Sequence, residues 1–465
     1  MQRSGIRGTS VGVPAWLLAA TALAYLNSLT AAFQFDDYNI IVDNPNVHSL
    51  AVWWQQVFTL RPLLKLGYAL NWSSGFGAFG FHGVNLLLHL ANVALLWRLS
   101  AHFPRPANWN LEQVHHARLL LLLLFALHPI QTEAVTYVSG RSMSQMALFA
   151  LAGLLCWLEA DSHARPILWR GAALLCFTAA LLSKEVALVV PLLLPLFSGR
   201  NARRDALWLA GFLVAAMLLL FLAFGYQHLL TEPPARGLGT NLASELNALF
   251  YLLGQLLHPL ALNIDPDLPE LHGFSLLLGL QLALLAATLI LAWLQRRQRP
   301  WLSFGIAWFV LLLLPTHSLI PRLDLASERH LYLAGIGIYW IVATAIAGLF
   351  PAARPLRLLR LASGPPTVRA RGGVLLALTV AGMGFTAARN ADYRDEISLW
   401  QATVAQSPGK ARVWNNLGYA HKLAGHDQEA RSAFLEALRR DPGYYRARAN
   451  LRELDMLANP SHLTR

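Results

Sequence analysis

The sequence has few charged residues and very few cysteines. Asp, Glu, Lys and Arg make up 13% of the 465 residues, whereas soluble globular domains carry about 25%, and 55% of the residues are hydrophobic. This composition excludes a soluble enzyme and favours a polytopic membrane protein. The two cysteines, Cys156 and Cys176, lie within apolar runs, so they offer neither a disulfide framework nor a cysteine-based metal site.

Two other features are scarce. Neither a nucleotide-binding motif nor an HExxH-like spacing of metal ligands is present, so we expect no cofactor and assign no metal ligands, while a requirement for a divalent metal stays open. Lysine is also rare, because 33 of the 37 basic residues are arginine. This bias indicates a GC-rich bacterial genome.

Long apolar stretches recur along the first 388 residues. A helix needs about 20 apolar residues to cross the roughly 30 Å of hydrocarbon in a bilayer, and the stretches 115–130 and 186–198 are short enough to require tilt or a thinned bilayer. We expect eleven membrane-spanning helices, at 12–32, 82–100, 115–130, 142–160, 167–183, 186–198, 205–225, 274–294, 301–320, 331–350 and 373–388.

The distribution of charge decides how the chain crosses the membrane. The net charge is +12, and a twelfth apolar stretch, 244–262, would invert the sidedness of everything after it if it crossed. If the N-terminus is cytoplasmic and 244–262 does not cross, the inner segments hold 18 cations and 4 acids, and the outer loops hold 7 cations and 12 acids. This is the positive-inside pattern, so 244–262 is interpreted as a re-entrant or interfacial helix. The sequence thus predicts an all-α polytopic bundle of about eleven spans in a bacterial inner membrane, with the C-terminus periplasmic and no nucleic-acid partner.

The composition changes after the membrane domain, residues 1–388. Residues 389–465 contain 12 cations and 9 acids, and we expect them to form a second domain. Its spacing W-x2-L-G…A-x3-F-x2-A…P matches a tetratricopeptide repeat, with His421 in place of the usual Tyr. Three repeats are usually needed for independent stability, so a tail of about two should pack on the membrane domain. It either docks a protein acceptor or is a helical cap without a partner.

Two adjacent carboxylates, Asp36 and Asp37, follow the first predicted span at the outer interface. Adjacent carboxylates repel each other, so one of such a pair usually has a raised pKa or a cation partner. They are candidates for a general base or for binding phosphate or metal. The alternative is a hydrated interfacial pair.

Polar side chains also recur along the second predicted span. His82, Asn85, His89 and Asn92 have the spacing i, i+3, i+7 and i+10, which places them on one helix face. That face must meet a cavity or another helix, and hydrogen bonding between helices is the simpler interpretation.

Three cations of the predicted outer face, Arg141, Lys184 and Arg329, each lie close to a carboxylate. An ionisable group at membrane depth costs about 2.5–3.5 kcal/mol on insertion scales and therefore needs a reason. Since Arg and Lys hold phosphates through charge-assisted hydrogen bonds, we predict that the three line one cavity that binds a lipid phosphate. The residues expected to support this site are Arg61, His89, His128, Glu133, Glu185, Glu328 and Tyr332.

Several motifs follow one another in a characteristic order: F-D-D, R-P-L, N-x3-H, H-P-I-x-T-E-A-V at 128–135, G-R, S-K-E, E-R-x-x-Y and the tetratricopeptide tail. In this order the sequence resembles the TMTC-type transmembrane O-mannosyltransferases with tetratricopeptide repeats, and their bacterial relatives, within the GT-C glycosyltransferase superfamily. The resemblance covers nearly the whole chain. The tail is the departure, because the family often carries many repeats.

The resemblance implies transfer of a sugar, expected to be mannose, from a polyprenyl-phosphate donor to a hydroxyl of a protein acceptor on the outer face, with inversion. It also implies that the first outer loop carries the acidic catalytic pair. We favour Asp36 as the base and Asp37 as the residue that orients the loop or the acceptor. The alternatives are another GT-C reaction (pilin or lipid glycosylation, or oligosaccharide ligation) and a non-catalytic membrane scaffold.

Overall fold

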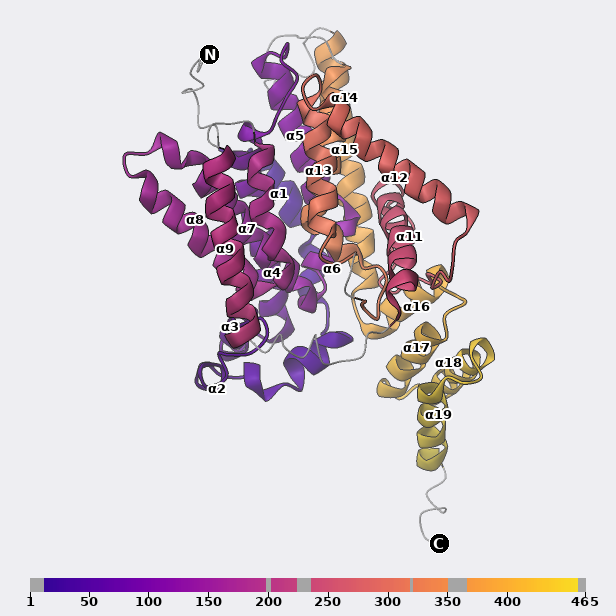
Figure 1. Cartoon of the computed structure of the whole chain (residues 1–465). Coiled ribbons are helices and arrows are strands. Elements are labelled where there is room, and N and C mark those ends of the chain that lie inside the picture. Colours follow the sequence, from indigo (N-terminus) through magenta and orange to yellow (C-terminus); the bar gives the residue numbers. More distant parts are fainter. Residues whose placement is uncertain (1–11, 198–201, 224–235, 318–320, 350–365, 459–465) are drawn as a thin grey trace.

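The computed structural model describes residues 12–197, 202–223, 236–317, 321–349 and 366–458 (Figure 1). Within these ranges every regular element is a helix. The predicted all-α fold is therefore confirmed.

The helices of the first 392 residues are those of a multi-pass membrane protein. Six helical segments are long and apolar enough to cross a membrane, and a bent pair, α5 (Leu111–Leu127) with Pro129–Val135, adds a seventh across a 49° break. Each of the eleven predicted stretches contains a helix, but some of these helices are short, so the number eleven stays a prediction. The six segments contain α4 (Gly77–Leu99), α7 (Arg141–Glu159), α8 (Pro166–Ser183), α12 (Leu276–Gln295), α14 (Leu331–Gly348) and α15 (Pro366–Asp392). Shorter apolar helices lie in α1 (Ala15–Ala24), the 3₁₀ helix Glu185–Leu196, α9 (Ala202–Ala223) and α13 (Pro300–Leu313).

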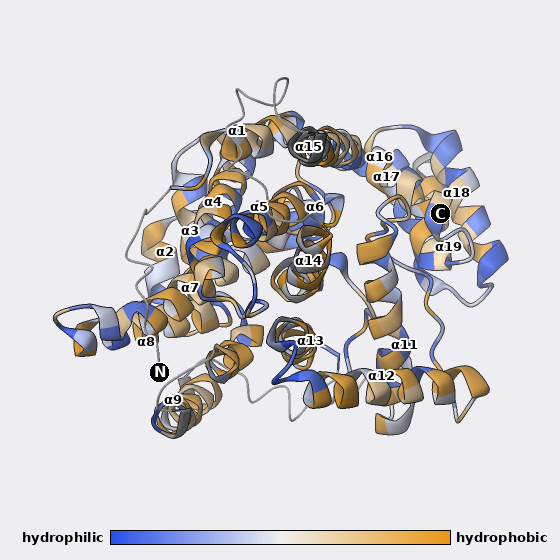
Figure 2. Ribbon diagram, turned by 90° about the horizontal axis from the view of Figure 1, so that it is seen from above, coloured by the Kyte–Doolittle hydropathy of each residue, from blue (hydrophilic) through white to orange (hydrophobic). Residues whose placement is uncertain are grey.

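Peripheral helices present apolar side chains outward, as a lipid-facing surface requires. In α12 the side chains of Leu277, Leu284 and Trp293 are all more than half exposed. Figure 2 shows that α9 and α12, which are rich in hydrophobic residues, lie at the edge of the bundle. An apolar face of this size is costly in water and favourable in hydrocarbon.

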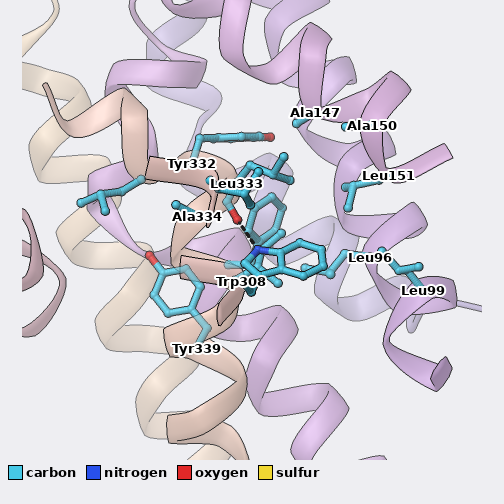
Figure 3. Close-up of a cluster of buried hydrophobic side chains, with 14 of the residues drawn as sticks. Leu96, Leu99, Ala147, Ala150, Leu151, Trp308, Tyr332, Leu333, Ala334 and Tyr339 are labelled. Atoms are coloured by element: carbon cyan, nitrogen blue, oxygen red, sulfur yellow. Dashed lines mark hydrogen bonds between the residues drawn. The ribbon is translucent and has the colours of Figure 1, made fainter. Parts of the chain in front are cut away.

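The centre of the bundle is formed around α14. The indole of Trp308 on α13 is fully buried and donates a hydrogen bond of 2.9 Å to the carbonyl of Leu333 (Figure 3). A Cβ atom added to Gly305 would lie 2.5 Å from the carbonyl oxygen of Gly337. The two glycines therefore allow the backbones of α13 and α14 to touch, as small residues do between membrane helices.

The polar stripe on α4 hydrogen-bonds to neighbouring segments. His82 contacts the Ala31 carbonyl at 3.0 Å, and Asn85 donates to the Val135 carbonyl at 3.0 Å. Asn92 donates to the carbonyl of Ser144 on α7 at 2.8 Å. The stripe therefore serves packing, as the simpler interpretation predicted.

The ambiguous stretch 244–262 lies largely in α11 (Leu238–Leu257), which packs against α12. This helix is not among the described helices that are apolar enough to cross a membrane. The sidedness of the chain stays a prediction. Some of the arginines on which this prediction of sidedness rests lie outside the described residues: Arg3, Arg7, Arg200, Arg354, Arg357 and Arg360.

The tail consists of α16 (Glu396–Gln406), α17 (Ala411–Leu423), α18 (Asp427–Arg440) and α19 (Tyr445–Ala458). α17 and α18 form a hairpin in which Gly418 lets the Phe434 ring approach, because a Cβ atom there would lie 2.7 Å from it. Figure 1 places this tail at the same end of the bundle as α2 (Leu50–Gln55) and α3 (Pro62–Ser73). The hairpin is the geometry that the repeat spacing predicts.

Candidate active site

The loop after α1 is bent sharply at the first catalytic candidates. Phe35 has a φ of 47°, a left-handed conformation that is uncommon outside glycine. Its backbone N–H donates to a carboxylate oxygen of Glu396 at 2.8 Å, and the N–H of Ala32 donates to the carbonyl of Arg394 at 3.0 Å. The strained turn is thus held by groups from the start of the tail.

Asp37 is buried and points into the protein. One carboxylate oxygen accepts hydrogen bonds from the N–H and hydroxyl of Ser139, at 2.8 and 2.5 Å, and the other accepts the N–H of Gln34 at 3.1 Å. Burial raises the pKa of Asp37 to about 7, against the lowering effect of these hydrogen bonds. Its contacts tie the loop to the segment Val138–Gly140, which is a positioning role.

Asp36 is half-buried and occupies a different environment. Its backbone N–H donates to the hydroxyl of Tyr137 at 3.1 Å. Burial raises the pKa of the Asp36 carboxyl, and the charge of Arg329 and a hydrogen bond with Tyr137 oppose this rise. Asp36 is therefore the member of the pair that faces a cation and remains partly accessible.

Four cations lie within electrostatic range of one another, and one of them, Arg329, also acts on the Asp36 carboxyl. We call Arg61, Lys184, Arg322 and Arg329 the cation cluster. Arg61 forms a bidentate pair with Glu185, at 2.7 and 2.9 Å, and Arg322 lies 3.5 Å from the same carboxylate. Burial lowers the pKa of Lys184, and the charges of Arg329, Arg61 and Arg322 lower it further. Such mutual repulsion between cations is relieved when an anion binds among them.

Glu133 holds both the backbone and the side chain of Arg329, a member of the cation cluster. Its carboxylate accepts the backbone N–H of Arg329 at 3.0 Å and the hydroxyl of Ser327 at 2.5 Å, and the Arg329 guanidinium lies 3.5 Å away. Gly140 lets its own segment pack on the backbone of Glu133, because any Cβ atom there would collide with the Glu133 carbonyl. The structure thus places Arg61, Glu133 and Glu185, three of the predicted supporting residues, in or next to the cation cluster, and their supporting role stays a prediction.

The structure does not bring Arg141 into the cation cluster. Its guanidinium is fully buried and donates to the side chains of Asn85 and Asn71, at 2.5 and 2.7 Å, and to the carbonyl of Phe81 at 2.8 Å. Because protein acceptors occupy its donors, Arg141 joins α3, α4 and α7. The predicted grouping of three cations is corrected in this respect: Lys184 and Arg329 lie together, and Arg141 has a packing role.

Four other predicted supporting residues make their side-chain contacts with groups outside the cation cluster, although Glu328 directly precedes Arg329 in the chain. His89 contacts the hydroxyl of Tyr332 at 2.8 Å and the carbonyl of Ala126 at 3.1 Å, inside the bundle. The ring of His128 accepts the N–H of Ile130 at 3.2 Å in the turn after α5. Glu328 accepts the backbone N–H of Asn263 and lies 3.6 Å from Arg389.

Sequence reasoning missed Tyr137, Arg322 and Glu396. Tyr137 lies two residues beyond the H-P-I-x-T-E-A-V motif, and Arg322 lies in the loop that the topology placed on the outer face, so position along the chain was the available signal. The loop after α11 carries a further ion pair, in which the Asp265 carboxylate pairs with Lys410 at 2.7 Å and with Arg412 of the tail.

The described ranges contain no group of three or more His, Cys, Asp or Glu side chains placed to hold a metal ion. The expected independence of cofactors stays a prediction. The chemistry available at the site is that of one accessible carboxylate beside several cations, with a tyrosine hydroxyl at its backbone.

Comparison with known proteins identifies relatives over nearly the whole chain. Protein O-mannosyl-transferase Tmtc3 of Drosophila melanogaster is 26% identical over 91% of this chain, and protein O-mannosyl-transferase F38B6.6 of Caenorhabditis elegans is 22% identical over 92%. Protein O-mannosyl-transferase Tmtc2 of Drosophila melanogaster is 36% identical over 37% of the chain. No family model and no solved structure matches.

The chain covers 54%, 62% and 20% of these three relatives, respectively, so it spans well under two thirds of their length. The resemblance to the TMTC type that the motif order predicted is confirmed. The bacterial origin stays a prediction, since the relatives named here are animal proteins.

Proposed function

We propose that this TMTC-like chain is a membrane glycosyltransferase that moves mannose from a polyprenyl-phosphate donor to a hydroxyl of a protein acceptor. The names of its relatives support the reaction class. The observation that carries the assignment of roles is the position of Asp36 beside Arg329 in the cation cluster.

The reaction needs a base on one side of the sugar. An acceptor Ser or Thr hydroxyl is a poor nucleophile at neutral pH, so a carboxylate must take its proton as the oxygen attacks the anomeric carbon. Asp36 performs this step. The bond from the anomeric carbon to the phosphate oxygen breaks on the opposite face, and the configuration inverts.

The cation cluster serves the leaving group. As the bond to the phosphate breaks, negative charge grows on the polyprenyl phosphate, and preorganised cations stabilise that charge. Lys184 and Arg329 bind the phosphate, while Arg61 and Arg322 add positive charge around Glu185. No residue of this scheme needs a cofactor.

The end of the bundle that carries Asp36 and Lys184 suits a reaction between a lipid-bound donor and a water-soluble acceptor. A polyprenyl tail stays in hydrocarbon and a protein acceptor stays in water, so the reacting atoms must meet at the boundary. Lys184 links α8 to the next apolar helix, and Asp36 follows α1, so both occupy turns at helix ends. We place this end of the bundle in the periplasm, together with the tail.

The test is transfer by the purified full chain in lipid nanodiscs. The donor is a polyprenyl phosphate bearing labelled mannose, and the acceptors are Ser- and Thr-containing peptides. We expect label on the peptides, in the anomeric configuration opposite to that of the donor. Transfer to lipid or oligosaccharide acceptors instead would show that the protein catalyses another GT-C reaction. If no hydroxyl acceptor receives the label, the protein would be a non-catalytic membrane scaffold.

A further inference from the structure

The loop that carries Asp36 depends on contacts from a distant part of the chain. The two residues before Asp36 contact the segment 393–400, about 360 positions away in the chain. The N–H of Phe35 donates to Glu396, and the Gln34 side chain donates to the carbonyl of Tyr393. The ring of Phe35 packs edge to face on Trp400, with 5.1 Å between centroids. Backbone and side chain of the turn are thus both held by the start of the tail.

These contacts are well placed to fix geometry. Trp400 is buried, and Phe35 packs against the cluster that Trp400 forms with Val413 and Leu417. Glu396 accepts the N–H of Phe35, the residue with a φ of 47°. A turn of this kind is strained and persists where the surrounding structure holds it in place.

The tail is anchored independently of this turn. Asp265, in the loop after α11, is buried and pairs with Lys410 and Arg412 at the start of α17. Arg412 also bridges to Asp324 at 2.6 Å, and its charge and that of Asp324 reach the Asp36 carboxyl. The tail therefore forms one side of the region around Asp36.

We propose that α16 is a built-in part of the active site, in which Glu396 and Trp400 act as positioning residues that hold Asp36 through Phe35. This inference rests on the proposed function. It assigns the start of the tail a role in the chemical step, distinct from any role of later helices in docking an acceptor. Loss of the contact should misplace the base without changing its chemistry, and a misplacement of about 1 Å can cost about 100-fold in rate.

The test compares Glu396→Ala, Glu396→Gln and the wild-type full chain in the transfer assay. Alanine removes the acceptor of the Phe35 N–H, whereas glutamine retains an oxygen that can accept it. We expect Glu396→Ala to lower kcat about 10- to 100-fold, with the KM values for donor and acceptor unchanged, and Glu396→Gln to restore most of the rate. Glu429→Ala, at an exposed position of α18, is the matched control and should behave as the wild type.

Each outcome has a distinct meaning. Wild-type kcat in Glu396→Ala overturns the inference, as does a selective rise in the acceptor KM, which would make α16 a docking element. A fall in the folded fraction by circular dichroism, with normal kcat per folded molecule, also overturns it. Failure of the wild type to transfer mannose would refute the proposed function instead, so the two failures are distinguishable.

Discussion

At the scale of single residues, the two neighbouring aspartates occupy different environments. Both carboxylate oxygens of Asp37 accept hydrogen bonds, one from Ser139 and the other from the N–H of Gln34. Asp36 keeps its carboxyl half-buried beside the charge of Arg329. Two adjacent side chains seldom point the same way, so the sequence predicts a single base, and the hydrogen bonds of Asp37 support the choice of Asp36.

The raised pKa of Asp36 predicts an unusual pH dependence. A general base works when it is deprotonated, so the acid limb of kcat/KM should lie above the ordinary Asp value of 3.8, because burial raises this pKa. The Arg329 charge lowers the pKa of Asp36, so Arg329→Gln should move the limb to higher pH. The measurement is the pH–rate profile of both enzymes, and a limb that stays in place or moves down would refute the assignment.

The cation cluster and Arg141 should respond differently to substitution. Lys184→Ala or Arg329→Ala removes a charge-assisted contact to phosphate worth about 1.5–3 kcal/mol, so the donor KM should rise roughly 10- to 100-fold with little change in the acceptor KM. Arg141→Ala leaves Asn85, Asn71 and the Phe81 carbonyl unsatisfied and should reduce thermal stability.

Steady-state kinetics and thermal melting of these three variants in nanodiscs decide between the two roles. A donor KM that rises only in Arg141→Ala would reverse the assignment of the phosphate ligands.

At the scale of elements, close contact between α13 and α14 positions the segment that carries Arg329. A Cβ atom on Gly337 would collide with the Gly305 carbonyl. Gly337→Val should therefore force the helices apart and cost at least about 1–3 kcal/mol, as overpacking does. Gly171→Val is the control, since a Cβ atom there meets nothing within 4 Å. Thermal unfolding at the wild-type temperature in Gly337→Val would contradict the contact.

Hydropathy and helical spacing predicted the elements well, because each rests on local pattern. The stripe His82, Asn85, His89 and Asn92 follows from a helical repeat, and the structure bonds it to adjacent segments. The pairing of Phe35 with Trp400 could not be predicted in this way. No local pattern relates two aromatic residues 365 positions apart, so the sequence gives no sign that Phe35 and Trp400 are in contact.

The misplaced Arg141 has a similar physical cause. Arg141 is the first residue of α7 and follows Gly140. A long side chain at the start of a helix can point into the bundle or away from it, and the sequence does not distinguish the two directions. Acceptors on α3 and α4 direct it inward. The sequence shows where a cation lies along the chain, but it does not show which groups accept its hydrogen bonds.

At the scale of the whole molecule, the tail lies at the same end of the bundle as α2 and α3 (Figure 1), and it contacts the loop that carries Asp36. The predicted sidedness puts this end in the periplasm, because it leaves 18 cations inside and 7 outside. A phosphatase reporter that is active only in the periplasm, fused after residue 465, should be active, and a cytoplasm-specific reporter at the same point should be silent. The reverse pattern would contradict the topology.

The central claim is that Asp36 accepts the proton of the acceptor hydroxyl, and the most direct measurement is single-turnover mannose transfer by Asp36→Asn with donor already bound. Asparagine keeps the shape of the side chain and removes the proton acceptor. We expect transfer to slow by about 10²–10⁴-fold while donor binding stays at the wild-type level, and we expect Asp43→Asn, a substitution in the same loop, to leave both unchanged. Near-normal transfer by Asp36→Asn, with donor bound equally well, would contradict the claim.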